Sequence, residues 1–235
     1  MFYPVKRRLT RRLPLHLTFT VLALLFPTRA VVADPIGIWN FNDSDLIVDH
    51  GAGTLTSNFN VANLSFAAGT SNNARLGDGA GQALSLQGGT SAANNGRNLT
   101  VALSTVGFAN IIFSFATQGT STGFNSNQFQ YSLDGVTFSD FGSPYTPLVA
   151  FGAVPIVFDL SGITGLNNNP DAAFRIVFNG ATTATGNNRM DNLVVEGSSA
   201  TIPEPASMAL LGSGLVTLVG LLRKKKLQGS EVRKP

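Results

Sequence analysis

The chain has 235 residues, 43% of them hydrophobic, no cysteine and a formal net charge of +3 at pH 7. Without cysteine it has neither disulfides nor thiol chemistry. The positive charge does not indicate a nucleic-acid partner, because it lies in two terminal clusters. Between Asp34 and Pro205, four arginines and no lysine accompany twelve acidic residues, a net charge of −8. Such a domain repels phosphate backbones, so a nucleic-acid-binding role is excluded.

Residues 1–33 have the three-part layout of a secretory signal peptide. A basic segment at 6–12 precedes a mostly apolar run at 13–26, and small side chains follow up to Ala33. We expect cleavage after Ala33, with Ala30 as the alternative site. An uncleaved anchor stays open as a second interpretation, because a proline and a histidine interrupt the apolar run. Both interpretations predict export.

Residues 34–200 are rich in Gly, Asn, Ser, Thr and Phe and show no long helical periodicity. Short apolar runs alternate with polar residues between turn signals, which predicts many strands. The dipeptide Asp134-Gly135 predicts a tight hairpin turn leading into Val136 and Phe138. The expected strands are 36–41, 61–66, 83–86, 99–103, 111–116, 129–133, 136–138, 155–160, 174–178 and 190–196.

About ten short strands without intervening helices predict an all-β fold, namely an antiparallel β-sandwich with jelly-roll topology as the expected arrangement. The length of this segment is sufficient for one hydrophobic core. Alternation places the aromatic and aliphatic side chains of 113–115 and 174–178 in that core, together with Trp39 and Tyr131. Tyr145 follows Pro144 on a predicted loop and is the best candidate for an exposed aromatic.

The two ends of this segment resemble the first and last strands of jelly-roll domains in secreted bacterial surface proteins. The resemblance rests on Ile38-Trp39-Asn40-Phe41 and on Arg189-Met190-Asp191-Asn192-Leu193-Val194-Val195. It implies that these two strands pair in one sheet.

Few residues in the segment suit catalysis. His50 is its only histidine and is expected in a loop, since neither a zinc ligand set nor a nucleophile elbow accompanies it. Asp43, Asp45 and Asp49 follow the first strand and are expected to form a solvated turn. Two alternatives stay open: calcium ligation by Asp43 and Asp45 with Asp191, and catalysis by paired carboxylates. We predict no catalytic residue and no cofactor other than this possible calcium.

Three asparagine-rich stretches, 72–73, 94–96 and 167–171, are expected to be turns, because asparagine tolerates left-handed backbone and bonds to its own turn. The alternative function is donation of hydrogen bonds to sugar hydroxyls.

The C-terminal part, 201–226, has three components in a fixed order. Pro203, Glu204 and Pro205 form a stiff, extended tripeptide, because each proline fixes its own φ and restricts its neighbour. Residues 206–222 carry no charge and predict a transmembrane helix of roughly 25 Å. The cations Arg223, Lys224, Lys225 and Lys226 follow it and are expected on the cytoplasmic side, with 227–235 as a cytoplasmic tail.

This order of tripeptide, apolar helix and basic cluster resembles the PEP-CTERM sorting signal of exported bacterial proteins. The resemblance implies that an exosortase, a transpeptidase-like membrane enzyme, recognises Pro203, Glu204 and Pro205. It also implies a producer of extracellular polysaccharide. The chain is then held in the membrane by its helix before processing and resides afterwards at the cell surface or outside the cell.

Three functions are compatible with these features: a noncatalytic protein of the cell surface or polysaccharide matrix, a tethered carbohydrate-binding module for neutral glycans, and a secreted hydrolase or lyase. The first is preferred, because the usual nucleophiles, bases and phosphate-binding cations are nearly absent. Exposed aromatics in a groove would favour the second, and converging carboxylates with shifted pKa values the third.

Overall fold

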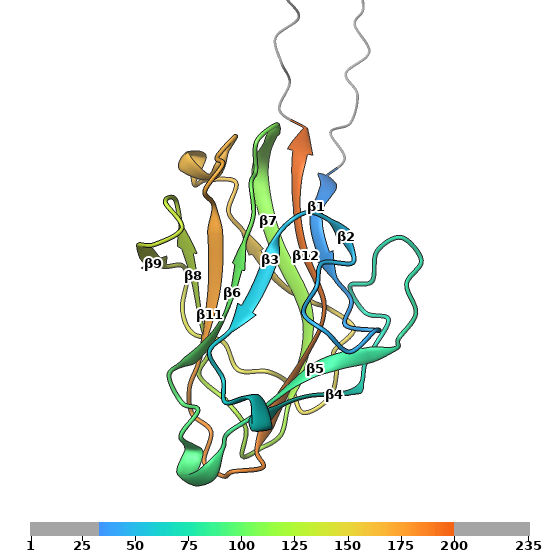
Figure 1. The fold of residues 1–235 in the computed structure, drawn as a ribbon, viewed down its shortest axis with the longest axis vertical. Coiled ribbons are helices and arrows are strands. Elements are labelled where there is room, and N and C mark those ends of the chain that lie inside the picture. The colour runs from blue at the N-terminus through green and yellow to red at the C-terminus, as the bar shows by residue number, and fades with distance from the viewer. Residues whose placement is uncertain (1–32, 200–235) are drawn as a thin grey trace, which may run out of the picture. The chain divides into compact units, whose positions relative to one another are not determined.

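The computed structural model describes residues 33–199, which form strands joined by loops and three short 3-10 turns (Figure 1). The elements in chain order are β1 (Ala33–Trp39), β2 (His50–Gly51), β3 (Thr54–Ser57), η1 (Val61–Asn63), β4 (Leu64–Ala68), β5 (Gln82–Gln87), η2 (Thr90–Ala92), β6 (Arg97–Ala102), β7 (Phe108–Gly119), β8 (Gln128–Ser132), β9 (Phe138–Asp140), β10 (Ile156–Asp159), η3 (Thr164–Leu166), β11 (Ala173–Phe178) and β12 (Asn187–Ser199).

The strands form two antiparallel sheets, which confirms the predicted all-β sandwich. Sheet A has seven strands: β10-β7-β12-β1-β2 lie in this order, and β5 pairs with both β12 and β4. Sheet B has five strands in the order β3-β6-β11-β8-β9. The chain crosses from one sheet to the other at most of its connections, as a jelly roll requires.

The core lies between the sheets and follows the predicted alternation. Phe113, Phe115, Phe174, Ile176 and Phe178 are each at most 1% exposed, which confirms the strand phase. Trp39 is fully buried as expected, and Tyr131 packs against the core with its ring half-buried. Within 33–199 the two sheets enclose one hydrophobic core, to which both sheets contribute.

The first and last strands pair with each other, as the resemblance of the two ends implied. Ala33 lies opposite Ser198 and Trp39 opposite Leu193. The chain therefore enters and leaves the sandwich at the same end, and we call this the tail end. β12 begins at the other end, which we call the distal end.

Two local predictions need correction. Residues 61–63 form a 3-10 turn instead of a strand, because Asn60 caps it by accepting the Ala62 N–H at 3.1 Å, and β4 begins only at Leu64. The β8–β9 hairpin forms, but its connection runs from residue 133 to 137. The Asp134 side chain sets this longer turn by accepting the N–H groups of Val136 and Thr137 at 2.9 and 2.7 Å.

Candidate binding face

The outer face of sheet B is polar and open. In β11, Phe174, Ile176 and Phe178 point into the core, so alternation directs Arg175 and Val177 outward. The same period applies to the neighbouring strands. It therefore assembles outward-facing residues that lie far apart in the sequence.

A row of polar residues crosses all five strands of sheet B in register. Thr56 pairs with Thr100, Thr100 with Arg175, Arg175 with Gln130, and Gln130 with Asp140. All five side chains are exposed or half-buried. Because neighbouring strands lie ~4.8 Å apart, the row extends for roughly 19 Å, the length of a short oligomer. We call it the Arg175 row.

Contacts within the row fix its side chains. The Arg175 Nε–H donates to Thr100 Oγ1 at 3.2 Å, and the guanidinium carbon lies 3.5 Å from the centroid of the Phe138 ring. Gln130 donates from Nε2 to Asp140 Oδ1 at 2.8 Å. Partial burial lowers the pKa of Arg175 below its ordinary value, although the group stays charged at neutral pH. The row therefore presents preorganised donors and acceptors with one stacked cation.

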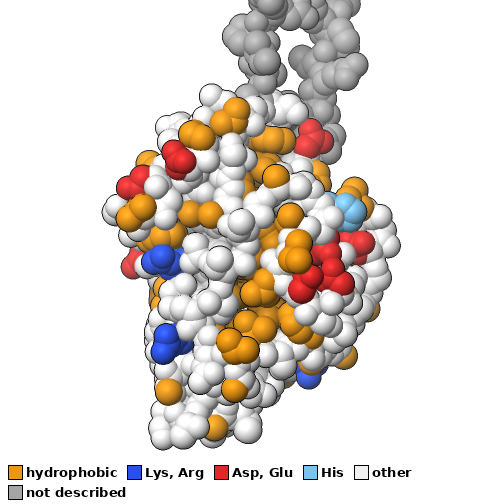
Figure 2. Space-filling model, in the orientation of Figure 1, with side chains coloured by type: hydrophobic (Ala, Val, Ile, Leu, Met, Phe, Trp, Pro, Cys, Tyr) orange, Lys and Arg blue, Asp and Glu red, His pale blue; other side chains and the backbone are white. Residues whose placement is uncertain are grey.

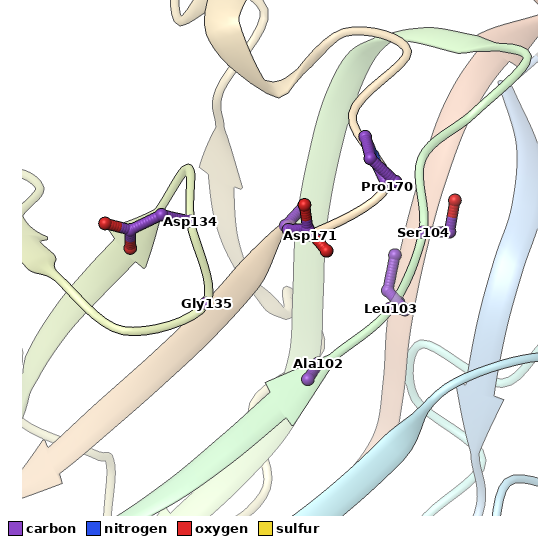
Figure 3. Close-up of a pocket in the computed structure, with 8 residues that line it drawn as sticks. Ala102, Leu103, Ser104, Asp134, Gly135, Pro170 and Asp171 are labelled. Carbon is purple, nitrogen blue, oxygen red and sulfur yellow. The ribbon is translucent and has the colours of Figure 1, made fainter.

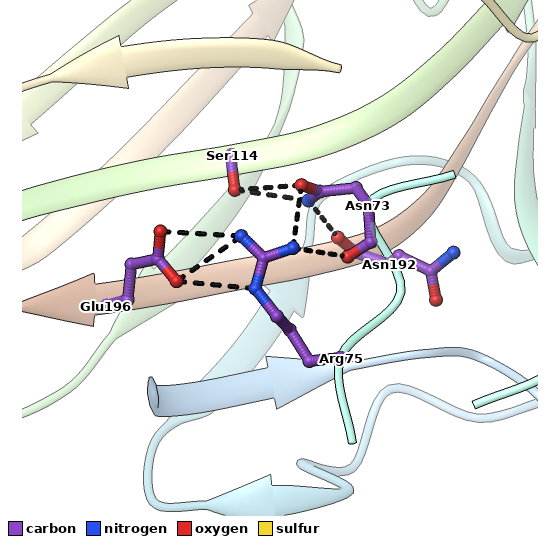
Figure 4. Close-up of polar contacts among 5 residues, drawn as sticks. All are labelled: Asn73, Arg75, Ser114, Asn192 and Glu196. Atoms are coloured by element: carbon purple, nitrogen blue, oxygen red, sulfur yellow. Dashed lines mark hydrogen bonds and ion pairs between the residues drawn. The ribbon is translucent and has the colours of Figure 1, made fainter. Parts of the chain in front are cut away.

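The outer face of sheet A is covered by the loop between β4 and β5, residues 69–81 (Figure 4). Asn73 donates from Nδ2 to Ser114 Oγ at 3.1 Å and to the Asn192 carbonyl at 2.8 Å. Arg75 forms an ion pair with Glu196 at 3.3 Å. Ser114 and Asn192 are accordingly buried although they face outward. Of the two outer faces, that of sheet B is therefore the one available to a ligand.

Asp191 lies beneath this covering loop. Its side chain is 1% exposed and accepts the N–H of Thr70 at 2.6 Å and that of Asn192 at 2.8 Å. Burial raises the pKa of Asp191 to about 7, and the two backbone hydrogen bonds oppose the shift only in part. The carboxyl group therefore fastens the loop to β12 at a bulge where Asn192 has a φ of 48°.

This burial predicts a pH-dependent stability. An acid whose pKa is higher in the folded state binds its proton more tightly there, so the free energy of unfolding falls as pH rises from about 4 to about 7. The slope is at most about 1.4 kcal/mol per pH unit. The Asp191→Asn variant lacks this pH-dependent part of the free energy of unfolding. Its loss of a hydrogen bond also lowers the stability by about 1–3 kcal/mol at every pH. Urea titrations at several pH values should show that the free energies of unfolding of wild type and variant converge as pH rises from about 4 to about 7. Parallel curves would contradict this assignment.

The aspartates after β1 form a turn, as expected. Asp49 Oδ2 accepts the Asn40 N–H at 2.6 Å, and Asp45 Oδ1 accepts the Ile47 N–H at 2.8 Å. Burial raises the pKa of Asp49, and neighbouring carboxylates, including Asp43, add to the shift. Figure 2 shows the acidic side chains gathered near a histidine on this side of the domain.

Within 33–199, no three His, Cys, Asp or Glu side chains are placed so that they could hold a metal ion. Calcium ligation by Asp43, Asp45 and Asp191 thus stays a prediction. His50 is exposed and lies in the two-residue strand β2 instead of a loop, where it pairs with Ile38.

The asparagine-rich stretches bond to their own protein. Asn168 Oδ1 accepts the Gly107 N–H at 2.9 Å, and Asn169 Nδ2 donates to the carbonyls of Leu133 and Gly165 at 3.0 and 2.8 Å. Asn95 exchanges two hydrogen bonds with Ala181, each of 3.0 Å. These amides hold the loops together, which supports the prediction of structural turns over that of sugar donors.

Tyr145 is not an exposed aromatic. Its ring centroid lies 5.8 Å from that of Phe115 and 6.0 Å from that of Phe158, and its hydroxyl is buried. Burial raises the pKa of the phenol well above its ordinary value. The prediction failed because Asn127 forms an isolated bridge with Tyr145, which draws this loop against the core.

A pocket of about 310 Å³ lies at the tail end of sheet B (Figure 3). Two carboxylates belong to its lining, but Figure 3 shows that the Asp134 side chain points away from Asp171. Its hydrogen bonds with Thr137 and Val136 also hold the pKa of Asp134 below its usual value. The pair therefore lacks the converging geometry of a catalytic acid and base. The lining residues are Ala102, Leu103, Ser104, Asp134, Gly135, Pro170, Asp171 and Ala172.

The residues of the Arg175 row were not predicted from the sequence as a site. A usable signal was present, because the same alternation that assigns Phe174 and Ile176 to the core assigns Arg175 to the opposite face. This alternation shows that Arg175 faces away from the core, but it does not show which residues of the other strands lie beside Arg175. Thr100 and Arg175, for example, are 75 positions apart.

The predicted signal peptide, the tripeptide Pro203–Pro205, the helix 206–222 and the basic stop 223–226 lie outside the described residues. Within 33–199, no helix is long and apolar enough to span a bilayer.

Comparison with known structures finds distant likenesses to carbohydrate-binding modules. TmCBM61 in complex with β-1,4-galactotriose has 9% sequence identity and a TM-score of 0.41, and the match covers 66% of this chain and 92% of that chain. The CBM22-1 xylan-binding domain of Xyn10C from Paenibacillus barcinonensis has 12% sequence identity and a TM-score of 0.43, and the match covers 73% of this chain and 99% of that chain. A third match is domain 4 of AbnA, a GH43 extracellular arabinanase from Geobacillus stearothermophilus, in complex with arabinotriose. It has 14% sequence identity and a TM-score of 0.39, and the match covers 72% of this chain and 95% of that chain. At these scores no binding site carries over.

No curated protein matches the sequence. The model of the PEP-CTERM protein-sorting motif matches residues 201–225, which include the tripeptide and most of the basic stop. This chain thus carries a PEP-CTERM sorting motif at its C-terminus, the mark of an exported and sorted protein.

Proposed function

We propose that the chain is a noncatalytic exported protein, which an exosortase-like enzyme sorts through Pro203, Glu204 and Pro205 to the cell surface or the extracellular polysaccharide matrix. The match of residues 201–225 to the sorting motif carries this proposal. Before processing, residues 206–222 hold the chain in the membrane and the basic stop stays in the cytoplasm. The sandwich then lies outside the cytoplasmic membrane.

The composition of the sandwich supports a noncatalytic role. Between Asp34 and Pro205 there is one histidine, no lysine and no cysteine. That histidine is exposed on an edge strand, and the two carboxylates of the tail-end pocket diverge. Neither arrangement supplies a nucleophile activated by a base.

The second candidate function is the binding of neutral polysaccharide on the outer face of sheet B. The in-register Arg175 row favours it, because hydroxyl, amide and guanidinium groups along ~19 Å of a pleated surface suit the hydroxyl groups of an extended oligosaccharide. The ligand is neutral, since a net charge of −8 between Asp34 and Pro205 repels acidic polymers.

Substitution in the row tests this function. For a chain ending at Ser199, Arg175→Ala should weaken binding of a soluble neutral glycan, first identified on a glycan array, by about tenfold or more. The reason is that a hydrogen bond from a charged donor contributes about 1.5–3 kcal/mol. Isothermal titration calorimetry, with and without added calcium, provides the measurement.

Arg97→Ala is the matched control, because it removes the same charge from the start of β6, where Arg97 is exposed and donates to the Asn58 carbonyl at 3.1 Å. Its affinity should stay close to that of wild type. Equal losses in both variants, or tight binding of an acidic polymer such as alginate without metal, would exclude the proposed face.

A further inference from the structure

The connections between strands at the distal end of the sandwich contain no charged residue, although Arg97 lies directly beside them at the start of β6 and donates to the Asn58 carbonyl. Five connections between strands lie there, since β12, β6 and β8 begin at this end while β3, β5, β7, β9 and β11 run toward it. Together they contain no Asp, Glu, Lys, Arg or His. Figure 2 shows only apolar and uncharged side chains at the tip farthest from the grey segments. The connections are residues 58–63, 88–96, 120–127, 141–155 and 179–186.

These charge-free connections contrast with the rest of the domain. Residues 33–199 hold eleven acidic residues and four arginines, a net charge of −7. The acidic residues lie instead on strands, on the loops beside β1 and β2, and at the tail end, where Asp134 and Asp171 line the pocket. Two copies that approach each other through those surfaces bring like charges together, at a cost of several kcal/mol for each close juxtaposition.

The distal connections are bonded to one another. Gly89 donates its N–H to the Ala184 carbonyl at 3.0 Å, and Thr182 donates to the Thr122 carbonyl at 3.0 Å. The Thr146 hydroxyl donates to the Asn125 carbonyl at 2.5 Å. Beneath them, the rings of Phe59, Phe124 and Phe178 pack edge to face with centroids 5.5–5.6 Å apart. Such a preorganised surface loses little conformational entropy when it binds.

The large apolar side chains exposed at this end are aliphatic, and they lie among exposed Asn, Ser and Thr residues. Val61 is 84% exposed, Leu148 65% and Val149 79%. Phe124 is buried beneath the loops, whereas Phe141, Tyr145 and Phe151 are partly buried. Aliphatic groups among hydroxyls and amides suit another protein surface better than a glycan.

We propose that the distal end binds the distal end of a second copy of this chain. An isologous contact of this kind buries the exposed valine and leucine side chains of both copies without bringing their carboxylates together. The chain leaves for its sorting motif at the opposite end, next to Ala33, so the contact surface is directed away from the anchored end. Two molecules displayed on separate surfaces can thus join tip to tip. This contact does not depend on the glycan-binding function proposed for sheet B.

Sedimentation velocity on the chain ending at Ser199 tests the proposal. A dilution series should show a monomer–dimer equilibrium that shifts toward dimer as salt is added, because salt screens the net charge of −7 and leaves the apolar contact intact. Val149→Asp and Leu148→Asp should each raise the dimer dissociation constant by about tenfold or more, because each variant places a carboxylate on both sides of the contact.

Val136→Asp is the matched control. Val136 is 80% exposed, close to the 79% of Val149, but it lies in the β8–β9 connection at the tail end. Its dimer should form as in wild type. Three results would overturn the proposal. They are a monomer at every protein and salt concentration, an equal rise of the dimer dissociation constant in Val136→Asp, and a dimer that dissociates when salt is added. If Val149→Asp abolished binding of a neutral glycan, the distal end would be the glycan-binding surface and the proposal would also be overturned.

Discussion

Replacing Phe129 by alanine should lower the free energy of unfolding by about 3–5 kcal/mol, the usual range for loss of a buried phenyl group. Phe129 is fully buried on β8, and its ring stacks on that of Phe158 with centroids 4.0 Å apart and an interplanar angle of 8°. It also lies 5.0 Å from the centroid of Phe113. The side chain thus bridges the two sheets, because β8 belongs to sheet B while β7 and β10 belong to sheet A.

Chemical denaturation followed by circular dichroism measures this change. The loss is a large part of the ~5–15 kcal/mol that stabilises a typical domain, and without cysteine no disulfide offsets it. Val136→Ala is the control, because a side chain that is 80% exposed should change stability by no more than about 0.5 kcal/mol. If the two variants were equally stable, the cluster of rings between the sheets would not be the source of stability inferred here.

Replacing Pro203, Glu204 and Pro205 together by alanine should abolish processing and leave a longer chain in the membrane. The two prolines keep Glu204 in an extended segment, and alanine frees that segment to join the apolar helix predicted to follow. The sorting enzyme then loses both the charge and the shape that it recognises. Mass spectrometry of the extracellular and membrane fractions compares the products.

The matched control replaces Gln228, Gly229 and Ser230 by alanine, since these lie beyond the matched residues 201–225. Its product should have the mass of the wild-type product. An extracellular wild-type protein that retains Lys226 would contradict processing at the tripeptide.

The strands were predictable where one face of a sheet is buried and the other is not. In β11 every second residue from Phe174 to Phe178 is apolar and large, so a period of two fixes which side chains enter the core. The same alternation predicted that Phe113 and Phe115 of β7 enter the core. It could not give the length of the β8–β9 connection, because the hydrogen bonds of Asp134 override the preference of Asp-Gly for a two-residue turn.

The candidate site was less predictable, since it is a product of strand order. Thr56, Thr100, Arg175, Gln130 and Asp140 become neighbours only when β3-β6-β11-β8-β9 is the order of sheet B. Local alternation directs Thr100, Gln130 and Arg175 outward, but Thr56 and Asp140 lie outside the predicted strands, and the sequence does not give the strand order.

Coverage of sheet A escaped prediction for a similar reason. The loop 69–81 is polar and rich in glycine, so its composition indicates a solvated surface segment. In the fold, its side chains instead bond to β7 and β12, more than 40 positions away. Nothing in the sequence marks these contacts, because asparagine is equally common in free turns.

The pairing of β12 has a mechanical consequence. This strand is thirteen residues long and is bonded to β1 and β7 over its C-terminal part, and to β5 and β7 over its N-terminal part. Tension that enters at Ser199 is directed along the strand axis, whereas the hydrogen bonds of an antiparallel ladder lie across it. The bonds are therefore sheared together instead of being peeled one after another. A pull between the anchored end and a load held elsewhere on the sandwich is shared by two ladders at once, so rupture requires the collective failure of the central strand.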